Sequence, residues 1–261
     1  MIRLVVSDID GTLIPDGYHT LKPRMKELVL ELKEKGITFV AASGRQYHSM
    51  KKLFDGVEDE VIFVAENGAY VVCRDKELEE NAMDKALAEK LIKELRQLED
   101  CFLTVSVKDS LYIESKDEEF VDLLVNGYRN EVTMVEDVLS HDLNIIKISI
   151  YKKEIIDDLA MTIIPKWEDK LKVSLAGHRW LDFMDLKVDK GHSIARIQDL
   201  LNISTDETIV FGDNINDIGM LKRAKDSYAV ANARQEVKAV AKHITGTHLN
   251  DGVIKVLETL I

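Results

Sequence analysis

Short apolar segments alternate with amphipathic helical segments at the start of the chain. Ile2 to Val6, Ile37 to Ser43 and Val61 to Asn67 are apolar runs of strand length that are rich in β-branched residues. Such runs are typical of strands buried on both faces. From Leu21 to Lys35, apolar residues recur at helical spacing, with a proline near the start and a glycine after the end. Strands separated by helices predict right-handed crossovers and a parallel sheet.

The middle of the chain has a different rhythm, which suggests a separate domain. A hairpin turn is expected near Asp75, followed by an amphipathic helix from Asp84 to Leu98. Further helices are predicted at 117–126 and 154–164, and further strands at 102–113, 144–150, 171–176 and 180–184.

The last part of the chain returns to the first rhythm. Helices are predicted at 191–201, 215–223, 235–241 and 252–260, with apolar strands at 207–213 and 227–232. We therefore predict an α/β fold with a Rossmann-like parallel-sheet core. Residues 1–82 and 187–261 would form this core, and residues 83–186 would form an inserted α/β domain.

The composition excludes several classes of protein. Hydrophobic residues make up 46% of the 261 residues, which favours a large buried core over a disordered chain. The formal net charge is −12, so nucleic acid, whose backbone selects basic surfaces, is not an expected partner. The same charge repels phosphorylated metabolites. A site for such metabolites must therefore supply its own cations or a bound metal ion.

The sequence predicts a cytoplasmic protein. Cys73 and Cys101 are far apart and lack metal-ligand spacing, which favours two reduced thiols. The apolar run at the N-terminus is too short for a signal peptide. No apolar stretch approaches the roughly 18 residues that would suggest a membrane span. We expect no membrane partner, and a monomer is the default expectation.

An acidic pair follows the first apolar run. Asp8 and Asp10 are separated by one residue, so both side chains of an extended segment point to the same side, and Gly11 permits a sharp exit. Ligand sites in open parallel sheets lie at the carboxyl ends of the strands. Two adjacent carboxylates repel each other and therefore favour a cation or a shared proton. Taken alone, the same residues also fit a solvated turn.

Two further clusters carry hydroxyl groups and cations. Ser43, Gly44 and Arg45 combine a hydroxyl, a flexible backbone and a cation at the start of a helix, an arrangement that suits a phosphate group. Lys190 lies just before a helix, where the inserted region rejoins the core. A lysine there can neutralise a nucleophile and a phosphoryl oxygen together. The simpler alternatives are an ordinary helix N-terminus and a surface lysine.

A fourth cluster contains Asp213 and Asp217, between an apolar strand and a helix. These acids can supply hard oxygen ligands to Mg²⁺, although helix capping is the simpler explanation of either one. All four clusters fall at strand ends. This shared placement indicates that they belong to one site.

The chain resembles the haloacid dehalogenase superfamily, and specifically its Cof-type phosphatases, over essentially its full length. The matching segments are DIDGTL (8–13), SGR (43–45), ENGA (66–69), DKG (189–191), GDNIND (212–217), AVANARQEVKAVA (229–241) and NDGV (250–253). One departure is Gly219, where the family usually has Glu. We expect this glycine to loosen its helix without removing a catalytic group.

The resemblance implies a mechanism. Asp8 would attack phosphorus and form an aspartyl-phosphate, while Asp10 would protonate the leaving alcohol and later take a proton from water. Lys190 would offset the negative charge of the site. Mg²⁺ would bind Asp8, Asp213 and the main-chain carbonyl of Asp10, with Asp217 bound directly or through another ligand.

The resemblance also implies how the substrate is held. Ser43 and Gly44 would contact the phosphoryl group, and Arg45, Asn67 and Asn216 are weaker candidates for phosphate or substrate contacts. The substrate would be a small phosphorylated metabolite, with sugar phosphates as the family-level expectation. The inserted domain would be a mobile cap that selects the substrate and excludes water.

Two features of the cap have alternative interpretations. His178, Arg179 and Trp180 either face a sugar or form a hairpin turn with one packed tryptophan. Lys147 is either a substrate contact or a lysine on an edge strand.

Three rival functions fit parts of the sequence. A phosphomutase or other phosphotransferase would share the nucleophile and Mg²⁺ but pass the phosphoryl group to a second hydroxyl. A phospho-receiver module would need an acceptor aspartate after the third strand, where this chain has Glu66 and Asn67. A binding protein without catalytic activity is disfavoured, since Asp8, Asp10 and Lys190 are all present.

Overall fold

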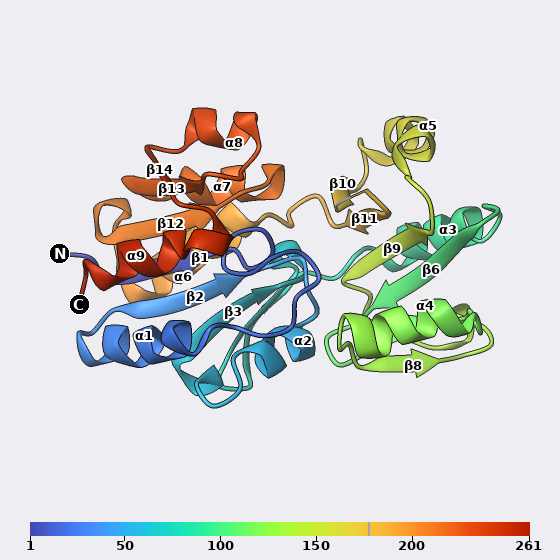
Figure 1. Cartoon of the computed structure of the whole chain (residues 1–261). Coiled ribbons are helices and arrows are strands. Elements are labelled where there is room, and N and C mark those ends of the chain that lie inside the picture. Colours follow the sequence, from blue (N-terminus) through green and yellow to red (C-terminus); the bar gives the residue numbers. More distant parts are fainter. Residues whose placement is uncertain (177) are drawn as a thin grey trace. The chain divides into compact units, whose positions relative to one another are not determined.

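The computed structural model describes residues 1–176 and 178–261, which fold into two compact units (Figure 1). The first unit consists of Met1–Leu78 and Asp189–Ile261, and the second unit of Glu79–Val188. The α/β fold with a parallel sheet and an inserted α/β unit, predicted from the alternating pattern, is confirmed.

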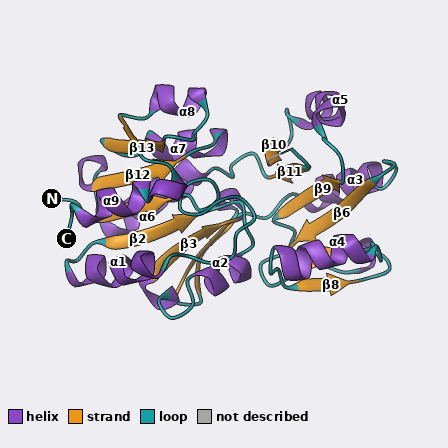
Figure 2. Ribbon diagram, in the orientation of Figure 1, coloured by secondary structure: helices purple, strands orange, loops and turns teal. Residues whose placement is uncertain are grey.

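A twisted sheet forms the centre of the first unit (Figure 2). Among the described residues its strand order is β14-β13-β12-β1-β2-β3-β4-β5. Its strands are β1 (Leu4–Ser7), β2 (Thr38–Ala42), β3 (Val61–Ala65), β4 (Tyr70–Cys73), β5 (Lys76–Glu80), β12 (Thr208–Gly212), β13 (Asp226–Val230) and β14 (His243–Thr245). The strands from β14 to β3 pair in parallel, and β4 pairs antiparallel with β3.

Strand β1 lies between β12 and β2, and all of its residues are buried. The β12 strand is a direct neighbour of β1 in the sheet, although Leu4 and its partner Thr208 are separated by the whole inserted unit in the sequence. The parallel register pairs Ser7 with Phe211 and with Ala41. The loops that follow β1, β2 and β12 therefore leave the sheet at the same edge.

Helices pack against this sheet. They are α1 (Pro23–Glu34), α2 (Tyr47–Leu53), α6 (Lys190–Leu201), α7 (Ile218–Leu221), α8 (Gln235–Val240) and α9 (Gly252–Glu258). Helix α1 buries the apolar stripe Met25, Leu28, Val29 and Leu32, starts on a proline, and packs against α9. The segment predicted as one helix at 215–223 starts with a 3₁₀ turn at Ile215–Asp217, because Asp217 turns back to the start of the loop.

The second unit contains a smaller, mainly antiparallel sheet. Among the described residues its strand order is β10-β11-β9-β6-β7-β8, and only the pair β7/β8 is parallel. Its strands are β6 (Cys101–Ser106), β7 (Leu111–Ile113), β8 (Val132–Met134), β9 (Lys147–Lys152), β10 (Lys172–Ala176) and β11 (Trp180–Met184).

Two sequence predictions for this unit were wrong in detail. The strand predicted at 102–113 is two antiparallel strands, because the chain turns where Val107 N–H donates to Ser110. Lys147 lies on β9, between β11 and β6, and is buried, so it is not an edge-strand lysine. Trp180 packs against Tyr151, with ring centroids 4.9 Å apart, while His178 and Arg179 are exposed.

Helices cover both faces of this second sheet. Helices α3 (Lys85–Leu95) and α5 (Asp157–Trp167) pack on one face, against an apolar core that includes Ile148, Ile150 and Phe183. Helix α4 (Glu118–Asp122) packs on the other face through Phe120. Helix α5 begins later than the predicted Glu154, with Asp157 and Asp158 in its first turn, where the helix dipole favours acidic residues.

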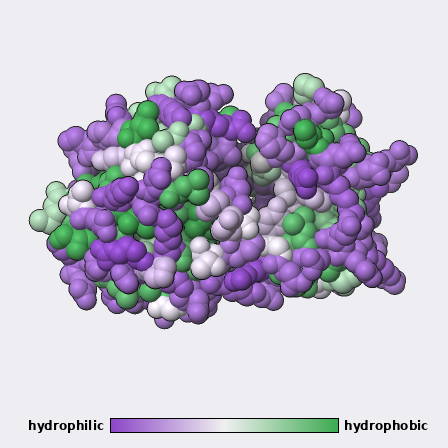
Figure 3. All heavy atoms as spheres, in the orientation of Figure 1, coloured by the Kyte–Doolittle hydropathy of each residue, from purple (hydrophilic) through white to green (hydrophobic). Residues whose placement is uncertain are grey.

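Most of the surface is polar. On the face shown in Figure 3, hydrophilic residues cover most of each unit, with apolar residues in small separate patches. Within the described residues, no helix is both long and apolar enough to cross a membrane. Cys73 and Cys101 are half-buried free thiols, and burial raises the pKa of each.

Replacing Phe120 with alanine should destabilise the second unit by about 3–5 kcal/mol. The Phe120 ring is buried and stacks on Phe102 at 4.7 Å and on Tyr151 at 5.5 Å, so the substitution leaves a cavity. Urea unfolding measures the effect. Val125→Ala, at a position 41% exposed in the adjoining π-helical turn, is the control and should change the stability by less than about 1 kcal/mol. Equal effects of the two substitutions would contradict this account of the packing.

Candidate active site

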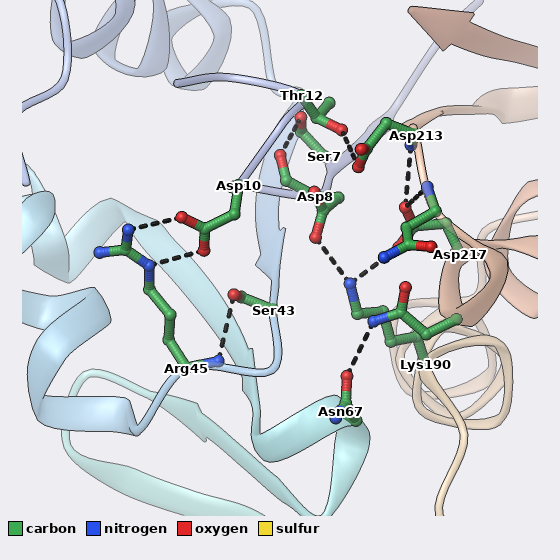
Figure 4. Close-up of polar contacts among 12 residues, drawn as sticks. Ser7, Asp8, Asp10, Thr12, Ser43, Arg45, Asn67, Lys190, Asp213 and Asp217 are labelled. Atoms are coloured by element: carbon green, nitrogen blue, oxygen red, sulfur yellow. Dashed lines mark hydrogen bonds and ion pairs between the residues drawn. The ribbon is translucent and has the colours of Figure 1, made fainter. Parts of the chain in front are cut away.

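Asp8 is the first residue after β1 and lies at the carboxyl edge of the parallel sheet. Its backbone N–H donates to Phe211 O at 3.0 Å, which extends the pairing of β1 with β12 by one residue. The side chain is 7% exposed. The strand geometry thus holds a carboxylate beside the loop that follows β12, which contains Asp213 and Asp217 (Figure 4).

Lys190 bridges two carboxylates in the interior of this site. Its ammonium donates to Asp8 Oδ1 and to Asp217 Oδ1, both at 2.7 Å, and its side chain is completely buried. Lys190 is the first residue of α6, whose N-cap Asp189 accepts hydrogen bonds from Gly191 N–H at 2.8 Å and His192 N–H at 3.3 Å. The capped helix start fixes the backbone from which the lysine extends.

Asp217 organises the loop after β12. Its Oδ2 accepts from the backbone N–H groups of Asp213 and Asn214, at 2.9 and 3.0 Å, while its Oδ1 accepts from Lys190. Both oxygens of this buried carboxylate therefore already accept hydrogen bonds. Asp217 fixes the loop and the lysine at the same time.

The turn after β1 packs closely on Asp213. Gly11 has φ +80°, and a Cβ atom there would lie 2.4 Å from Asp213 Oδ2, so the position requires glycine. Thr12 Oγ1 donates to Asp213 Oδ1 at 3.1 Å. Asn232 Nδ2 donates to the carbonyl of Gly11 at 2.7 Å, and His248 Nδ1 also contacts that carbonyl, at 3.1 Å.

Sequence reasoning gave no role to Thr12, Asn232 or His248. The first two lie in the segments DIDGTL and AVANARQEVKAVA, which were already noted for their resemblance to the family. That resemblance and, for Thr12, its place just after the acidic pair at the end of β1 were the signals available for these two residues.

Asp10 pairs with Arg45 and not with Asp8. Its two carboxylate oxygens accept from Arg45 Nε at 2.7 Å and Nη2 at 2.6 Å, and Nη2 also donates to Tyr18 O at 2.7 Å. In Figure 4 the Asp10 carboxylate points toward Arg45, while that of Asp8 points toward Lys190. The bidentate geometry fixes the orientation of the Asp10 carboxylate.

The remaining predicted contact residues gather beside Lys190. Ser43 follows β2, and its Oγ accepts from Arg45 N–H at 3.2 Å. Asn67 N–H donates to Ser43 O at 2.9 Å, and Asn67 Oδ1 accepts from Asn216 Nδ2 at 2.9 Å. A Cβ atom on Gly44 would lie 3.2 Å from Asn67 Oδ1. The structure therefore places Ser43, Gly44, Asn67 and Asn216 in one cluster.

Burial dominates the electrostatics of the site. It raises the pKa of Asp8 well above its ordinary value, and repulsion from Asp217 adds to this effect, whereas Lys190 opposes it. Burial and then repulsion from Asp217 raise the pKa of Asp213 to about 7. Burial lowers the pKa of Lys190, but the attraction of Asp217 and Asp8 exceeds that effect and the pKa is raised. One lysine thus faces three carboxylates.

The acidic residues fit a hard divalent cation. Oxygen atoms of Asp8, Asp213 and Asp217 lie within 4.8 Å of one another. Asp8 Oδ2 is buried and has no hydrogen-bond partner among the residues that the structure describes. A buried carboxylate oxygen without a donor is costly, and a cation would satisfy it.

Helices α6 and α7 approach each other at two glycines. A Cβ atom on Gly219 would lie 2.3 Å from Asp189 Oδ1, and one on Gly191 would lie 2.3 Å from the Gly219 carbonyl carbon. We expected Gly219 to loosen its helix, but the structure shows a steric role for this glycine. The missing side chain leaves room for the Asp189 cap that precedes Lys190.

Comparison with known proteins agrees with this arrangement. The family model for haloacid dehalogenase-like hydrolases matches residues 5–257. The chain belongs to this family. It is 27% identical, over 261 residues, to the 5-amino-6-(5-phospho-D-ribitylamino)uracil phosphatase YbjI of Escherichia coli K12, and the match covers 100% of this chain and 96% of that protein.

Solved structures of this family have the same fold. A crystal structure from Eubacterium rectale is 33% identical, with a TM-score of 0.90, and the match covers 100% of this chain and 99% of that one. The subclass IIB sugar phosphatase BT4131 is 21% identical, with a TM-score of 0.80, and the match covers 99% of this chain and 98% of that one. The predicted enzyme class, a phosphoric monoester hydrolase of this family, is confirmed.

Gly219→Ala should destabilise the protein by about 2–4 kcal/mol, since it combines overpacking with loss of the Asp189 cap. Phosphatase activity should fall with stability, because the cap holds the backbone of Lys190. Urea unfolding and turnover of p-nitrophenyl phosphate measure the two effects. The control is Gly127→Ala, where the added Cβ would meet the flexible Leu123 side chain at 3.2 Å, and we expect a change below about 1 kcal/mol. A Gly219→Ala variant as stable as the control would contradict the steric argument.

Proposed function

We propose that the protein is a Mg²⁺-dependent phosphatase that hydrolyses small phosphorylated metabolites, with sugar phosphates as the preferred class, through an aspartyl-phosphate on Asp8. The observation that carries this proposal is the Asp8 carboxylate itself. It is buried, one of its oxygens accepts from Lys190, and the other has no hydrogen-bond partner among the described residues. A carboxylate that is oriented by a lysine and keeps one oxygen without a donor is suited to attack phosphorus beside a cation.

In the first step, one oxygen of the Asp8 carboxylate forms a bond to phosphorus while the bond from phosphorus to the leaving alcohol breaks. Lys190 donates to Asp8 Oδ1 and offsets the repulsion between two anions. Asp10 gives a proton to the leaving oxygen. In the second step a water molecule attacks phosphorus, Asp10 takes its proton, and the Asp8–phosphorus bond breaks to release phosphate.

The Arg45 contact sets a condition on the role of Asp10. Both carboxylate oxygens of Asp10 accept hydrogen bonds from Arg45, so this contact must change before either oxygen can turn toward the leaving group. The phosphoryl group of the substrate is a competing acceptor for Arg45. Substrate binding would therefore release Asp10 for proton transfer.

Asp8, Asp213 and the main-chain carbonyl of Asp10 would hold Mg²⁺, supported by Asp217, which also holds Lys190 and the loop. When bound, the ion supplies positive charge that stabilises the phosphoryl oxygens. Ser43 and Asn67 would donate hydrogen bonds to the same group. The second unit would select the organic part of the substrate. The E. coli relative supports this substrate class, because its name specifies a phosphorylated ribityl chain.

Asp8→Asn should lower phosphatase activity by about 10⁴-fold or more, because it removes the nucleophile but keeps the shape of the side chain. Release of free phosphate from p-nitrophenyl phosphate and from sugar phosphates measures the loss. The same assay separates hydrolysis from transfer to a second hydroxyl, which leaves no free phosphate. Asp199→Asn, at an exposed position on α6, is the control and should retain full activity. Substantial activity in Asp8→Asn would refute the nucleophile.

Mg²⁺ should stabilise the protein more at pH 8 than at pH 5. The raised pKa of Asp213 means that the folded chain keeps a proton that the unfolded chain loses between about pH 4 and pH 7. Without a divalent ion, the free energy of unfolding therefore falls as the pH rises through this range. A bound cation offsets the buried charge, and protons compete with it at low pH.

Thermal unfolding with EDTA or with MgCl₂ tests this dependence. At ten times its dissociation constant, the ion contributes about 1.4 kcal/mol, which raises Tm by about 2–4 °C. We expect that rise at pH 8, a smaller rise at pH 5, and none in Asp213→Asn. An equal rise at both pH values, or one that persists in Asp213→Asn, would contradict the proposed metal site.

A further inference from the structure

Two segments that resemble the family have no part in the proposed chemistry at Asp8. They are AVANARQEVKAVA (229–241) and NDGV (250–253). The first segment contains Asn232, and the second ends the loop between β14 and α9, which carries His248. Both of these side chains contact the same atom, the carbonyl oxygen of Gly11. Gly11 lies in the turn of residues 9–14 after β1, which we name the acidic turn.

The acidic turn is closed by its own backbone hydrogen bonds. Gly11 N–H donates to Ile14 O at 2.7 Å, and Ile14 N–H donates to Ile9 O at 3.1 Å. The Gly11 carbonyl, by contrast, accepts from outside the turn. Asn232 Nδ2 donates to it at 2.7 Å, and the ring Nδ1 of His248 lies 3.1 Å from it. Since a carbonyl oxygen can only accept, Nδ1 carries the hydrogen in this contact.

The Gly11 carbonyl needs this support because the position requires a glycine. The φ angle is +80°, and a Cβ atom would lie 2.4 Å from Asp213 Oδ2. Glycine has the widest choice of backbone conformations, so its peptide groups are the least restrained in the turn. Two donors on one carbonyl use both of its lone pairs and fix the plane of the peptide between Gly11 and Thr12. The two side chains therefore offset the freedom that glycine introduces.

The orientation of this peptide affects two groups of the proposed metal site. Before Gly11 comes Asp10, whose main-chain carbonyl is a proposed ligand of Mg²⁺. After Gly11 comes Thr12, whose Oγ1 donates to Asp213 Oδ1 at 3.1 Å (Figure 4). Rotation of the Gly11 peptide would displace both groups.

The loop that carries His248 is held in place by hydrogen bonds of its own. Thr245 Oγ1 donates to Gly252 O at 2.8 Å, and Gly252 N–H donates to Thr247 O at 3.0 Å, which closes the base of the loop. Asn232 Oδ1 accepts from the backbone N–H of His248 at 3.4 Å, so the two donors are also joined to each other. Two segments from the end of the chain thus hold the turn that follows its first strand.

We propose that Asn232 and His248 are positioning residues that fix the Gly11 peptide and so preorganise the acidic turn for Mg²⁺. They act through Gly11 and not on the reacting atoms. This inference rests on the proposed function, because the ion is that of the proposed phosphatase. Loss of one of the two donors should weaken Mg²⁺ binding roughly 2- to 12-fold, the effect of one hydrogen bond.

Hydrogen exchange and calorimetry test the proposal without turnover. His248→Leu and Asn232→Leu each remove one donor and keep most of the side-chain volume. In the metal-free protein, mass spectrometry should show roughly 2- to 12-fold faster amide exchange in residues 9–14 of each variant. Isothermal titration of MgCl₂ should give a dissociation constant that is higher by a similar factor. Asp213→Asn, which lacks a proposed ligand, measures the heat of binding elsewhere on the acidic surface.

A conservative variant separates positioning from simple loss of packing. His248→Asn keeps an N–H donor close to the position of Nδ1 and should restore most of the exchange protection and Mg²⁺ affinity. The control is Asn250→Leu, the same substitution as Asn232→Leu at an exposed position in the 3₁₀ turn His248–Asn250. It should change neither quantity. A lower Tm with unchanged exchange and unchanged Mg²⁺ affinity in both leucine variants would overturn the proposal.

Failure of this inference and failure of the proposed function give different results. A wild-type protein that binds no Mg²⁺ and releases no phosphate from p-nitrophenyl phosphate would contradict the proposed function. Exchange in residues 9–14 then decides the role of the two residues, because it requires neither ion nor substrate. Faster exchange in both leucine variants, restored by His248→Asn, supports the positioning role, and unchanged exchange overturns it.

Discussion

The ion pairs of Lys190 are the interaction on which the site depends. A completely buried ammonium lies 2.7 Å from two buried carboxylates, one from the strand end after β1 and one from the loop after β12. Burial of any one of these charged groups alone would be unfavourable. Each charge is stabilised in the interior only by the opposite charge that lies beside it. The site is therefore one electrostatic unit, in which removal of a single member leaves the others uncompensated.

Even with Lys190, the site carries an excess of negative charge. Asp8, Asp213 and Asp217 share one buried cation, and burial raises the pKa of both Asp8 and Asp213. The protein as a whole is also acidic. A phosphate ester approaches such a site only if further positive charge is present, and this requirement links the proposed Mg²⁺ to binding as well as to chemistry.

The fold was predictable where its signals are local. Continuous apolar runs predicted the strands β1, β2, β3 and β12, because strands that are buried on both faces lack polar residues. Helix α1 was predicted from the proline at its start and from its apolar stripe. Short strands with few buried residues, β8 and β14, were not predicted, since three residues show no period. Their pairing depends on neighbours that are distant in sequence.

The site was predictable in position but not in its pairings. Strand ends meet at one edge of a parallel sheet, so Asp8, Ser43 and Asp213 were expected near one another. The Asp10–Arg45 pair could not be foreseen, because sequence gives the direction of a strand but not the rotamers of long side chains after it.

The insertion of the second unit has a consequence for biosynthesis. Asp8 and Lys190 are 182 positions apart in the chain, yet their side chains share a hydrogen bond. During synthesis, Asp8 leaves the ribosome before the inserted unit and Lys190 leaves it after that unit. The ion pair between Asp8 and Lys190 can therefore form only after the whole inserted unit has been synthesised.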